Sequence, residues 1–201
     1  EMNLNLILIR HGQSEGNVDH EVYYQKPDHY IKLTEKGVQQ AIELGKKLKE
    51  EYFEENKNRV IFSPWERAKT TASIISSFIK PLTSYEDSLT HEIALNHSLK
   101  EMVETRKEFA SPEKDEYSFY WYKEHTAESY ADVYKRARIF YQDLIINKYK
   151  FKDNDNVFIV SHGVFILMLK AVILNTSVDD ILKERWLGNC ETWKTSIETI
   201  G

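Results

Sequence analysis

The chain has 201 residues, of which 41% are hydrophobic and 29% are charged, and its formal net charge is −5. A chain of this length and composition can bury one full core, so we expect a single domain over residues 1–201. The acidic balance argues against nucleic acid or an anionic membrane as a partner, because proteins that bind them carry a basic surplus. Cys190 is the one cysteine. It excludes an internal disulfide and a thiolate zinc site, and it favours a reducing, cytoplasmic location.

The predicted elements begin with a buried strand at residues 4–9, in which Asn5 is the one polar side chain. The strand runs directly into Arg10 and His11, at the point where an apolar strand should stop. Its apolar run is too short for the hydrophobic region of a secretory signal, so we expect no targeting segment there.

Two helices and a strand are predicted next. An amphipathic helix lies within residues 33–56, with Thr34 as its N-cap and apolar residues at helical spacing. A short buried strand follows at residues 59–63. We expect the second helix to start at once, with Ser63 as its cap and Pro64 in the first helical position.

The second half of the chain continues the alternation of strands and helices. Residues 128–149 predict an amphipathic helix, residues 157–160 a buried strand, and residues 163–174 an apolar helix too short to span a bilayer. Periodicity weakens over residues 92–127, with aromatics at 117–122, which fits an insertion or lid, or a helix packing its rings on the core. The order predicts an α/β fold, a three-layer α/β/α sandwich with a mostly parallel central sheet.

Polar residues follow the carboxyl ends of three of the predicted strands. Arg10 and His11 follow the first strand, Arg67 lies just beyond the second, and His162 follows the last. Ligands of open α/β sheets bind beyond these strand ends, so we expect one cleft to hold all four residues. Two guanidiniums supply forked donors that match a phosphate, and two imidazoles can supply a nucleophile and a further donor.

Each of these residues also has a simpler interpretation. A histidine at a strand end is often structural, and Arg67 by itself fits an ion pair with Glu66 or Glu101. Two histidines can also form a metal site, but adjacent arginines repel a cation and no compact cluster of aspartate and histidine accompanies them. Their occurrence together at three strand ends favours an anion cleft, with neither a metal nor a cofactor.

Four segments resemble signatures of the histidine phosphatase superfamily, in the branch that includes the cofactor-dependent phosphoglycerate mutases. RHGQSEGN is similar to R-H-G-x-x-x-x-N, and SPWERAKTTA is similar to S-P-x-x-R-A-x-x-T-A. ESYADVYKRA resembles G-E-S-x-x-D-V-x-x-R, preceded by alanine where glycine is usual, and VSHG resembles the last motif. The four segments occur in the family's order and cover the chain nearly end to end. The resemblance implies a phosphoglycerate mutase-like fold.

The resemblance also implies metal-independent chemistry on phosphate monoesters. In that chemistry His11 attacks phosphorus and forms a phosphohistidine, while Arg10, Arg67 and His162 hold the equatorial phosphate oxygens. Asn17 stands at the matching position of the first motif, where it would contact the phosphate or orient the first loop.

The family's proton donor is a carboxylate on the segment after the second helix. Glu92 is our candidate, because it follows a strand-like stretch at residues 88–91 that would end near His11. The family pattern is L-x-E, and a gapless match to L-T-H-E places His91 in the acid position. Glu86 and Asp87 are further alternatives.

Three functions remain open at this point. The first is a phosphatase that hydrolyses a phosphorylated small molecule or a phosphoprotein, the second a cofactor-dependent phosphoglycerate mutase, and the third a non-catalytic phosphate-binding module. The intact set of cleft residues argues against the third. Mutases of this branch carry E-R-H-Y-G after the acid's leucine and a paired-arginine element, whereas this chain reads HEIALNHS and has Arg106–Lys107 as the nearby basic pair. Hydrolysis is therefore expected to outrun transfer. A homodimer is an open expectation, because homodimers are common among the mutases.

Overall fold

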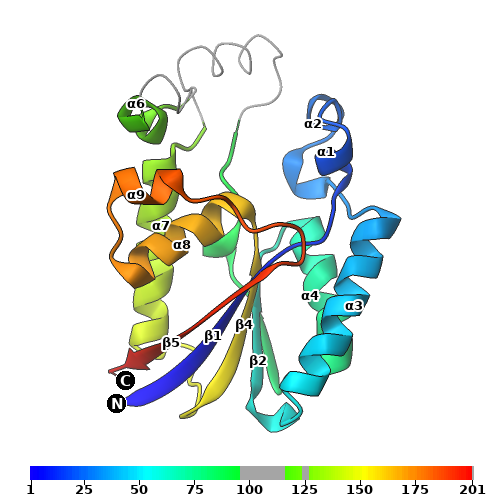
Figure 1. The fold of residues 1–201 in the computed structure, drawn as a ribbon, viewed down its shortest axis with the longest axis vertical. Helices are drawn as coiled ribbons and strands as arrows, with labels where there is room; N and C mark the ends of the chain where they lie inside the picture. Colours follow the sequence, from blue (N-terminus) through cyan, green and yellow to red (C-terminus); the bar gives the residue numbers. More distant parts are fainter. Residues whose placement is uncertain (96–115, 124–126, 201) are drawn as a thin grey trace.

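A mostly parallel sheet forms the centre of the computed structural model, which describes residues 1–95, 116–123 and 127–200 (Figure 1). Within those ranges the strand order is β3-β2-β4-β1-β5. The first four strands run parallel, and β5 pairs antiparallel with β1 at one edge. The strands are β1 (Met2–Arg10), β2 (Asn58–Phe62), β3 (Thr83–Glu86), β4 (Asp155–Ser161) and β5 (Thr192–Thr199). The strands β3 and β5 were not predicted.

Helices cover both faces of this sheet, as Figure 1 shows in a view along its edge. α3 (Glu35–Glu51) and α4 (Glu66–Ile79) lie on one face, and α7 (Tyr130–Ile145) and α8 (Gly163–Leu174) lie on the other. Shorter helices are α1 (Glu15–Val18), α2 (Val22–Gln25), α6 (Glu116–Trp121) and α9 (Val178–Lys183), with 3₁₀ turns at Asp28–Tyr30, Glu55–Lys57 and Ser88–Thr90. The predicted three-layer α/β/α sandwich is therefore confirmed.

The side-chain alternation of β1 divides the core between the two faces. Leu6 and Leu8 join the buried cluster under α7 and α8, whereas Ile7 and Ile9 join the cluster under α3 and α4. A parallel strand covered on both faces reads as a continuous apolar run, which is why residues 4–9 were recognisable in the sequence.

Helix starts agree with the sequence in one case and differ in another. Thr34 caps α3 as predicted, with its hydroxyl accepting a hydrogen bond from Gly37 N at 3.0 Å. The predicted cap at Ser63 is wrong: Trp65 holds the N-cap position of α4, and the helix begins at Glu66. The Ser63 hydroxyl is instead 2.7 Å from a ring nitrogen of His162.

The irregular middle of the chain lies partly outside the described residues, so most of the predicted insertion or lid at residues 92–127 is not described. The aromatic stretch forms α6, in which Tyr120 is buried and the Phe119 ring packs edge-on against Tyr130 at 4.7 Å. These rings support the core-packing interpretation for that part. The strand-like stretch at residues 88–91 is a 3₁₀ turn over Ser88–Thr90, so that expectation was wrong.

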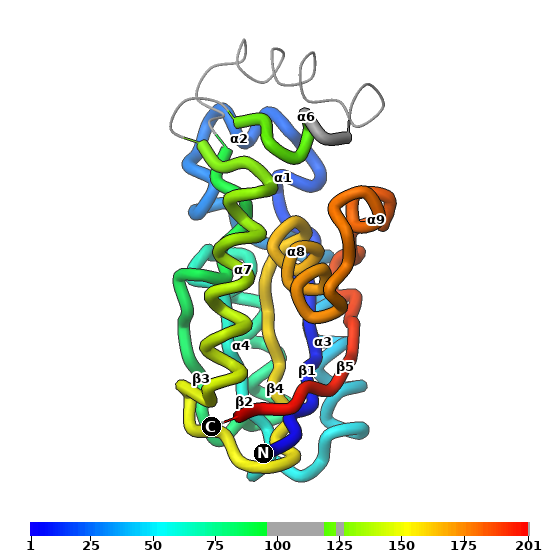
Figure 2. Tube along the Cα trace, turned by 90° about the vertical axis from the view of Figure 1, so that its left-hand side faces the viewer, coloured from blue at the N-terminus to red at the C-terminus, as the bar shows by residue number. Residues whose placement is uncertain are grey.

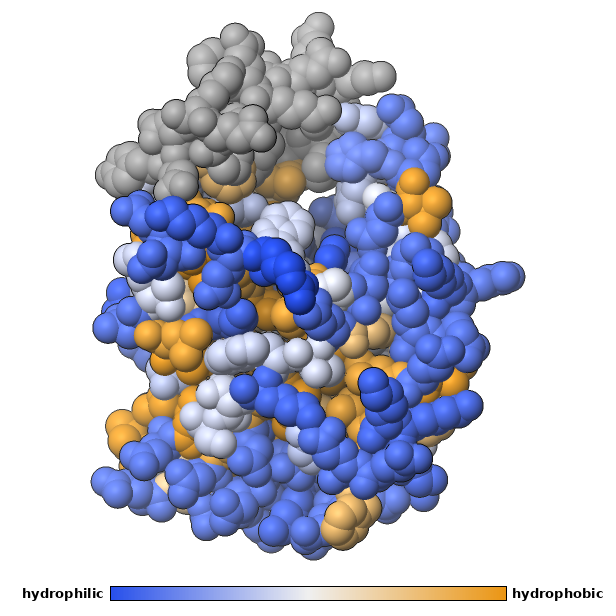
Figure 3. All heavy atoms as spheres, viewed as in Figure 1, coloured by the Kyte–Doolittle hydropathy of each residue, from blue (hydrophilic) through white to orange (hydrophobic). Residues whose placement is uncertain are grey.

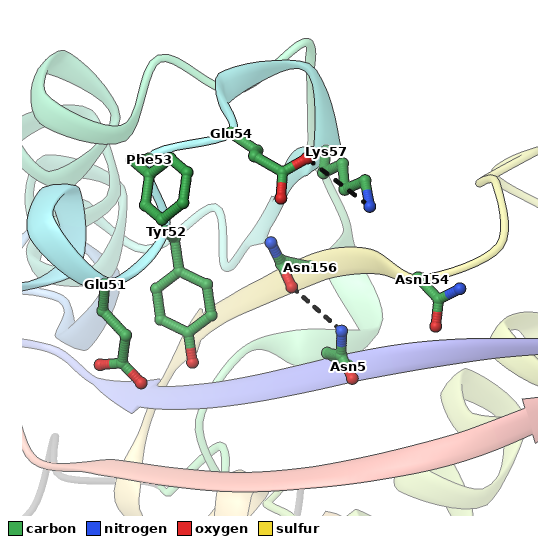
Figure 4. A pocket seen from close by; sticks show the side chains of 8 residues that line it. All are labelled: Asn5, Glu51, Tyr52, Phe53, Glu54, Lys57, Asn154 and Asn156. Carbon is green, nitrogen blue, oxygen red and sulfur yellow. Dashed lines mark hydrogen bonds and ion pairs between the residues drawn. The ribbon is translucent and has the colours of Figure 1, made fainter.

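The two ends of the sheet differ in chemistry. Both termini lie at the amino end of β1, at the bottom of Figure 2. A hollow there is lined by Asn5 and Asn156, whose amides bond each other at 3.1 Å (Figure 4). Asn156 also donates to Asn58 at 3.2 Å, so the side-chain amides beside this hollow form hydrogen bonds with one another. The predicted site lies at the opposite end.

Hydrophilic residues cover most of the face drawn in Figure 3, with apolar residues in smaller patches between them. Among the described helices, none has both the length and the apolar character needed to cross a membrane.

Two glycines fix the loop after β1 against the start of α3. A Cβ added to Gly37 would lie 2.0 Å from the Gln13 carbonyl oxygen, and one added to Gly12 would lie 2.5 Å from the Gly37 carbonyl oxygen. Both contacts are with backbone atoms that cannot rotate away, so the loop that carries His11 depends on this close approach.

We expect Gly37→Ala to lower the free energy of unfolding by about 1–3 kcal/mol, the usual range for overpacking. Urea denaturation followed by circular dichroism measures the change. Lys36→Ala is the matched control, since Lys36 is the exposed neighbour on the same helical turn. Equal stability of the two variants would contradict the close-approach argument.

Candidate active site

The candidate site lies at the carboxyl ends of β1, β2 and β4, at the top of the sheet in Figure 1. The parallel register pairs Arg10 with Ser161, and Phe62 with Val160. Residues that follow these strands therefore emerge at one level. The ladder continues one bond further, because His11 N donates to Ser161 O at 3.0 Å.

The ring of His11 has one nitrogen tied to the backbone and one nitrogen facing a guanidinium. Its Nδ1 is 2.7 Å from the carbonyl oxygen of Gly12, so Nδ1 carries the proton and donates it. Its Nε2 accepts a hydrogen bond from Arg67 Nε at 3.3 Å. The lone pair of Nε2 is therefore the reactive position of this imidazole.

Burial and nearby cations keep His11 neutral. Burial lowers its pKa well below the ordinary value of 6.5, and the charges of Arg67 and Arg10 lower it further. The same causes, led by burial and Arg67, lower the pKa of His162 well below 6.5. Both imidazoles are thus neutral at neutral pH, with one ring nitrogen free of a proton, as a nitrogen nucleophile must be.

Arg67 is fixed by Asp28, a residue that sequence analysis did not single out. Its Nη1 lies 2.9 Å from a carboxylate oxygen of Asp28 and also donates to the Asp28 carbonyl oxygen at 2.7 Å. Burial raises the pKa of Asp28, while the guanidinium of Arg67 opposes that rise. Of the two partners considered from the sequence, Glu66 is not paired with Arg67, and Glu101 lies outside the described residues.

His162 stands beside His11 and is held by Ser63. The two imidazole centroids are 5.2 Å apart in an edge-on arrangement. Nε2 of His162 is 2.7 Å from the Ser63 hydroxyl, whereas its Nδ1 is buried and has no hydrogen-bond partner among the described residues. A buried polar atom without a partner needs an explanation, and a ligand is one.

The segment between α9 and β5, residues 184–191, closes one side of the site and is called the strap below. Arg10 donates from Nη1 to the carbonyl oxygen of Leu187 at 2.8 Å, while its Nε is buried without a partner among the described residues. Asn189 of the same strap donates to His11 O at 3.2 Å and to Asn17 Oδ1 at 3.1 Å. The strap thus connects the strand end with the first loop.

Asn17 orients the first loop. Its Oδ1 accepts from Ser14 N at 3.0 Å, and the Ser14 hydroxyl accepts from Asn17 N in return. This reciprocal capping box starts α1 and sets the direction in which the loop leaves His11.

The side chain of Glu92 reaches the N-terminus of α8, a helix that comes much later in the chain. Its carboxylate accepts hydrogen bonds from Val164 N at 3.0 and 3.1 Å and from Phe165 N at 3.1 Å. These are N–H groups at a helix start that the helix itself cannot satisfy. The His91 ring stacks instead on Trp65, with an interplanar angle of 16°.

Arg136 and Glu128 clamp the segment that carries Glu92. The Arg136 guanidinium donates to the carbonyl oxygens of Leu89 at 2.5 Å and His91 at 2.9 Å, and it pairs with Glu128 at 2.9 Å. Both residues belong to the third signature segment, so that segment positions the candidate acid by holding its backbone.

Most of the candidate residues line one hollow of about 180 Å³, and His162, which stands beside His11, is not part of its wall. Five residues predicted from the sequence are brought together in its wall, namely Arg10, His11, Asn17, Arg67 and Glu92. The wall also contains residues that no motif in the sequence singled out: His20, Tyr23, Asp28, Ile93, Leu95 and Trp186. Most of these come from loops without a periodic pattern, so a motif match had no signal for them. Among the described residues, no group of three or more metal-ligating side chains is arranged around a common point.

A family model of the histidine phosphatase superfamily (branch 1) matches residues 6–199. The chain therefore belongs to this superfamily, as the four signature segments predicted.

Relatives and solved structures agree with this assignment. The phosphoglycerate mutase-like protein AT74H of Arabidopsis thaliana is 30% identical over 92% of this chain and 71% of its own length. The mycobacterial glucosyl-3-phosphoglycerate phosphatase superposes with a TM-score of 0.74 at 21% identity, covering 96% of this chain and 90% of the other. The phosphoserine phosphatase of Entamoeba histolytica gives a TM-score of 0.70 at 25% identity, with coverages of 95% and 89%.

We expect nitrogen NMR of the imidazole rings to show His11 protonated on Nδ1 alone at pH 7, with no second proton as the pH falls past 6.5. His11→Ala and His162→Ala variants assign the two ring signals. The unfolded chain binds protons at these positions below 6.5 and the folded chain does not, so the free energy of unfolding falls as the pH drops through that value. Titration of His11 near 6.5 in the folded protein would contradict the assignment.

Proposed function

We propose that the protein is a metal-independent phosphatase that hydrolyses phosphate monoesters through a phosphohistidine on His11. The observation that supports this proposal most strongly is the state of the His11 ring: it is neutral, it is fixed by Gly12, and its Nε2 accepts a hydrogen bond from the Arg67 guanidinium. A neutral nucleophile among cations suits attack on an anionic phosphorus centre.

In the first step the Nε2–P bond forms while the bond from phosphorus to the leaving oxygen breaks. Arg10 and Arg67 offer guanidinium donors to the equatorial oxygens from the wall of the hollow. The buried Nδ1 of His162, which has no partner among the described residues, offers a third contact beside His11. Ser63 supports this role, because a hydroxyl that donates to Nε2 leaves the proton of His162 on Nδ1. Asn17 orients the loop or contacts the phosphate.

Glu92 is the proposed proton donor to the leaving oxygen. Its place in the wall of the hollow supports it over His91, whose ring is stacked on Trp65. In the second step a water attacks phosphorus, the N–P bond breaks, and inorganic phosphate leaves with His11 regenerated. Glu92, now a carboxylate, takes the proton of that water.

Phosphoglycerate mutase is the alternative function. A mutase must hold a carboxylate-bearing intermediate while that intermediate reorients in the site. This requires cations beyond those that bind the phosphate, and a site closed to water. Within the described part of the wall, Arg10 and Arg67 are the cationic side chains, apart from the histidines. With no cation left to bind a substrate carboxylate there, the described wall supports hydrolysis over phosphoryl transfer to a second substrate hydroxyl. The proposed setting is cytoplasmic, with a phosphorylated small molecule or phosphoprotein as the partner.

We expect His11→Ala to abolish release of phosphate from monoesters, since no other group replaces the nucleophile. Brief exposure to ³²P-labelled substrate should give acid-labile label on the wild-type chain and none on the variant. His29→Ala is the control, because its ring is exposed. Activity should survive EDTA.

Two outcomes would defeat this proposal. Full activity of His11→Ala would remove the phosphohistidine, and a strict requirement for a metal would restore the metal-site interpretation. Conversion of 3- to 2-phosphoglycerate faster than phosphate release would favour the mutase.

We expect Glu92→Gln to lower kcat for alkyl phosphates by about 10²–10⁴-fold, the usual contribution of a general acid. The loss should be much smaller for p-nitrophenyl phosphate, whose leaving group needs little protonation. Asp87→Asn is the comparison variant for a neighbouring carboxylate. An equal loss on both substrates for Glu92→Gln would assign the residue to the helix cap alone and return His91, Glu86 and Asp87 as candidates.

A further inference from the structure

Part of the wall of the hollow is apolar and lies next to the phosphate centre. Ile93 and Leu95 follow the candidate acid directly in the chain, and Trp186 comes from the strap between α9 and β5. Trp186 packs on Gly163 at the start of α8, where an added Cβ would lie 2.8 Å from the indole. The bare backbone of that glycine, which follows His162 in the chain, lets the indole approach the start of α8.

The strap that carries Trp186 is held in place before any ligand binds. Arg185 forms a two-pronged ion pair with Glu191, at 2.8 and 2.5 Å, and Gly188 N donates to the same carboxylate at 2.5 Å. These hydrogen bonds lower the pKa of Glu191 to about 2, so the carboxylate stays charged throughout the neutral range. Arg10 ties the strap to β1 through the Leu187 carbonyl oxygen.

The charges around the hollow disfavour a second anionic group on the substrate. Arg67 is already paired with Asp28, and Arg10 and Arg67 are the groups that a phosphate would use. Apart from histidines, the described part of the wall offers no further cationic side chain, neither a lysine nor a third arginine. A carboxylate on the substrate would be buried in this wall without a guanidinium or ammonium partner, which is costly.

The size of the hollow limits the substrate as well. Its volume of about 180 Å³ is below the range of roughly 300–1,000 Å³ that is usual for drug-sized ligands. A phosphate with one ring-sized group is the scale that this space suits.

We propose that the leaving alcohol of the substrate is a small, flat, uncharged apolar group, as in an aryl or benzylic phosphate, and that Trp186 selects it by ring contact. This inference rests on the proposed phosphatase function and adds the substrate class to it. It separates the chain from the two solved phosphatases named above, since glucosyl-3-phosphoglycerate and phosphoserine each carry a carboxylate.

The test compares benzyl phosphate with 4-carboxybenzyl phosphate, which differ by one carboxylate at similar leaving-group reactivity. We expect kcat/KM to favour benzyl phosphate by about 10-fold or more, because the carboxylate lacks a cation. Trp186→Ala should lower kcat/KM for benzyl phosphate about 10–100-fold, the scale of one buried aromatic contact, and lower kcat/KM for glycerol 3-phosphate by a clearly smaller factor. Trp186→Phe should restore most of the preference.

Trp121→Ala is the matched control, because Trp121 is a half-exposed tryptophan on α6 and is not part of the wall. Equal kcat/KM for the two benzyl substrates in the wild-type protein would overturn the inference, whether or not Trp186→Ala folds. So would an equal effect of Trp186→Ala on benzyl and glycerol phosphates. If His11 takes up label and p-nitrophenyl phosphate is hydrolysed, but benzyl phosphate is not preferred, only the proposed substrate class is wrong. If His11 takes up no label and p-nitrophenyl phosphate is not hydrolysed, the proposed phosphatase function is wrong as well.

Discussion

The site depends on the parallel pairing of β1 with β4. This pairing sets Arg10 opposite Ser161, and the bond from His11 N to Ser161 O extends it by one residue. Two histidines that are 151 positions apart in the chain therefore stand with their ring centroids 5.2 Å apart. A slip of one residue would turn His11 to the other face of the sheet, since strand side chains alternate.

Charge explains why the centre of the site has to be rigid. Arg10 and Arg67 repel each other and depress the pKa of His11, so each must be fixed by other parts of the fold. Asp28 holds Arg67 from the first loop, and the Leu187 carbonyl oxygen holds Arg10 from the strap. A preorganised set of donors of this kind can stabilise a phosphoryl transition state without reorganising.

The candidate acid, Glu92, is positioned by a separate set of contacts, made by α7 and α8. Arg136 of α7, paired with Glu128 just before that helix, holds the backbone around Glu92, and the N–H groups at the start of α8 bind the Glu92 carboxylate. Both helices cover the same face of the sheet and share one buried cluster. The position of Glu92 relative to His11 is therefore tied to the packing of that face.

The sequence by itself determined the α/β order, the strand ends and the family, because apolar runs that stop at Arg10 or His162 leave a local pattern. The start of α4 and the 3₁₀ turn before Glu92 were decided only by tertiary structure, since Ser63 bonds a distant ring instead of capping its helix. Asp28 and Trp186 likewise needed the fold. Their contacts with Arg67 and Gly163 join segments far apart in the chain, and such contacts leave no periodicity in the sequence.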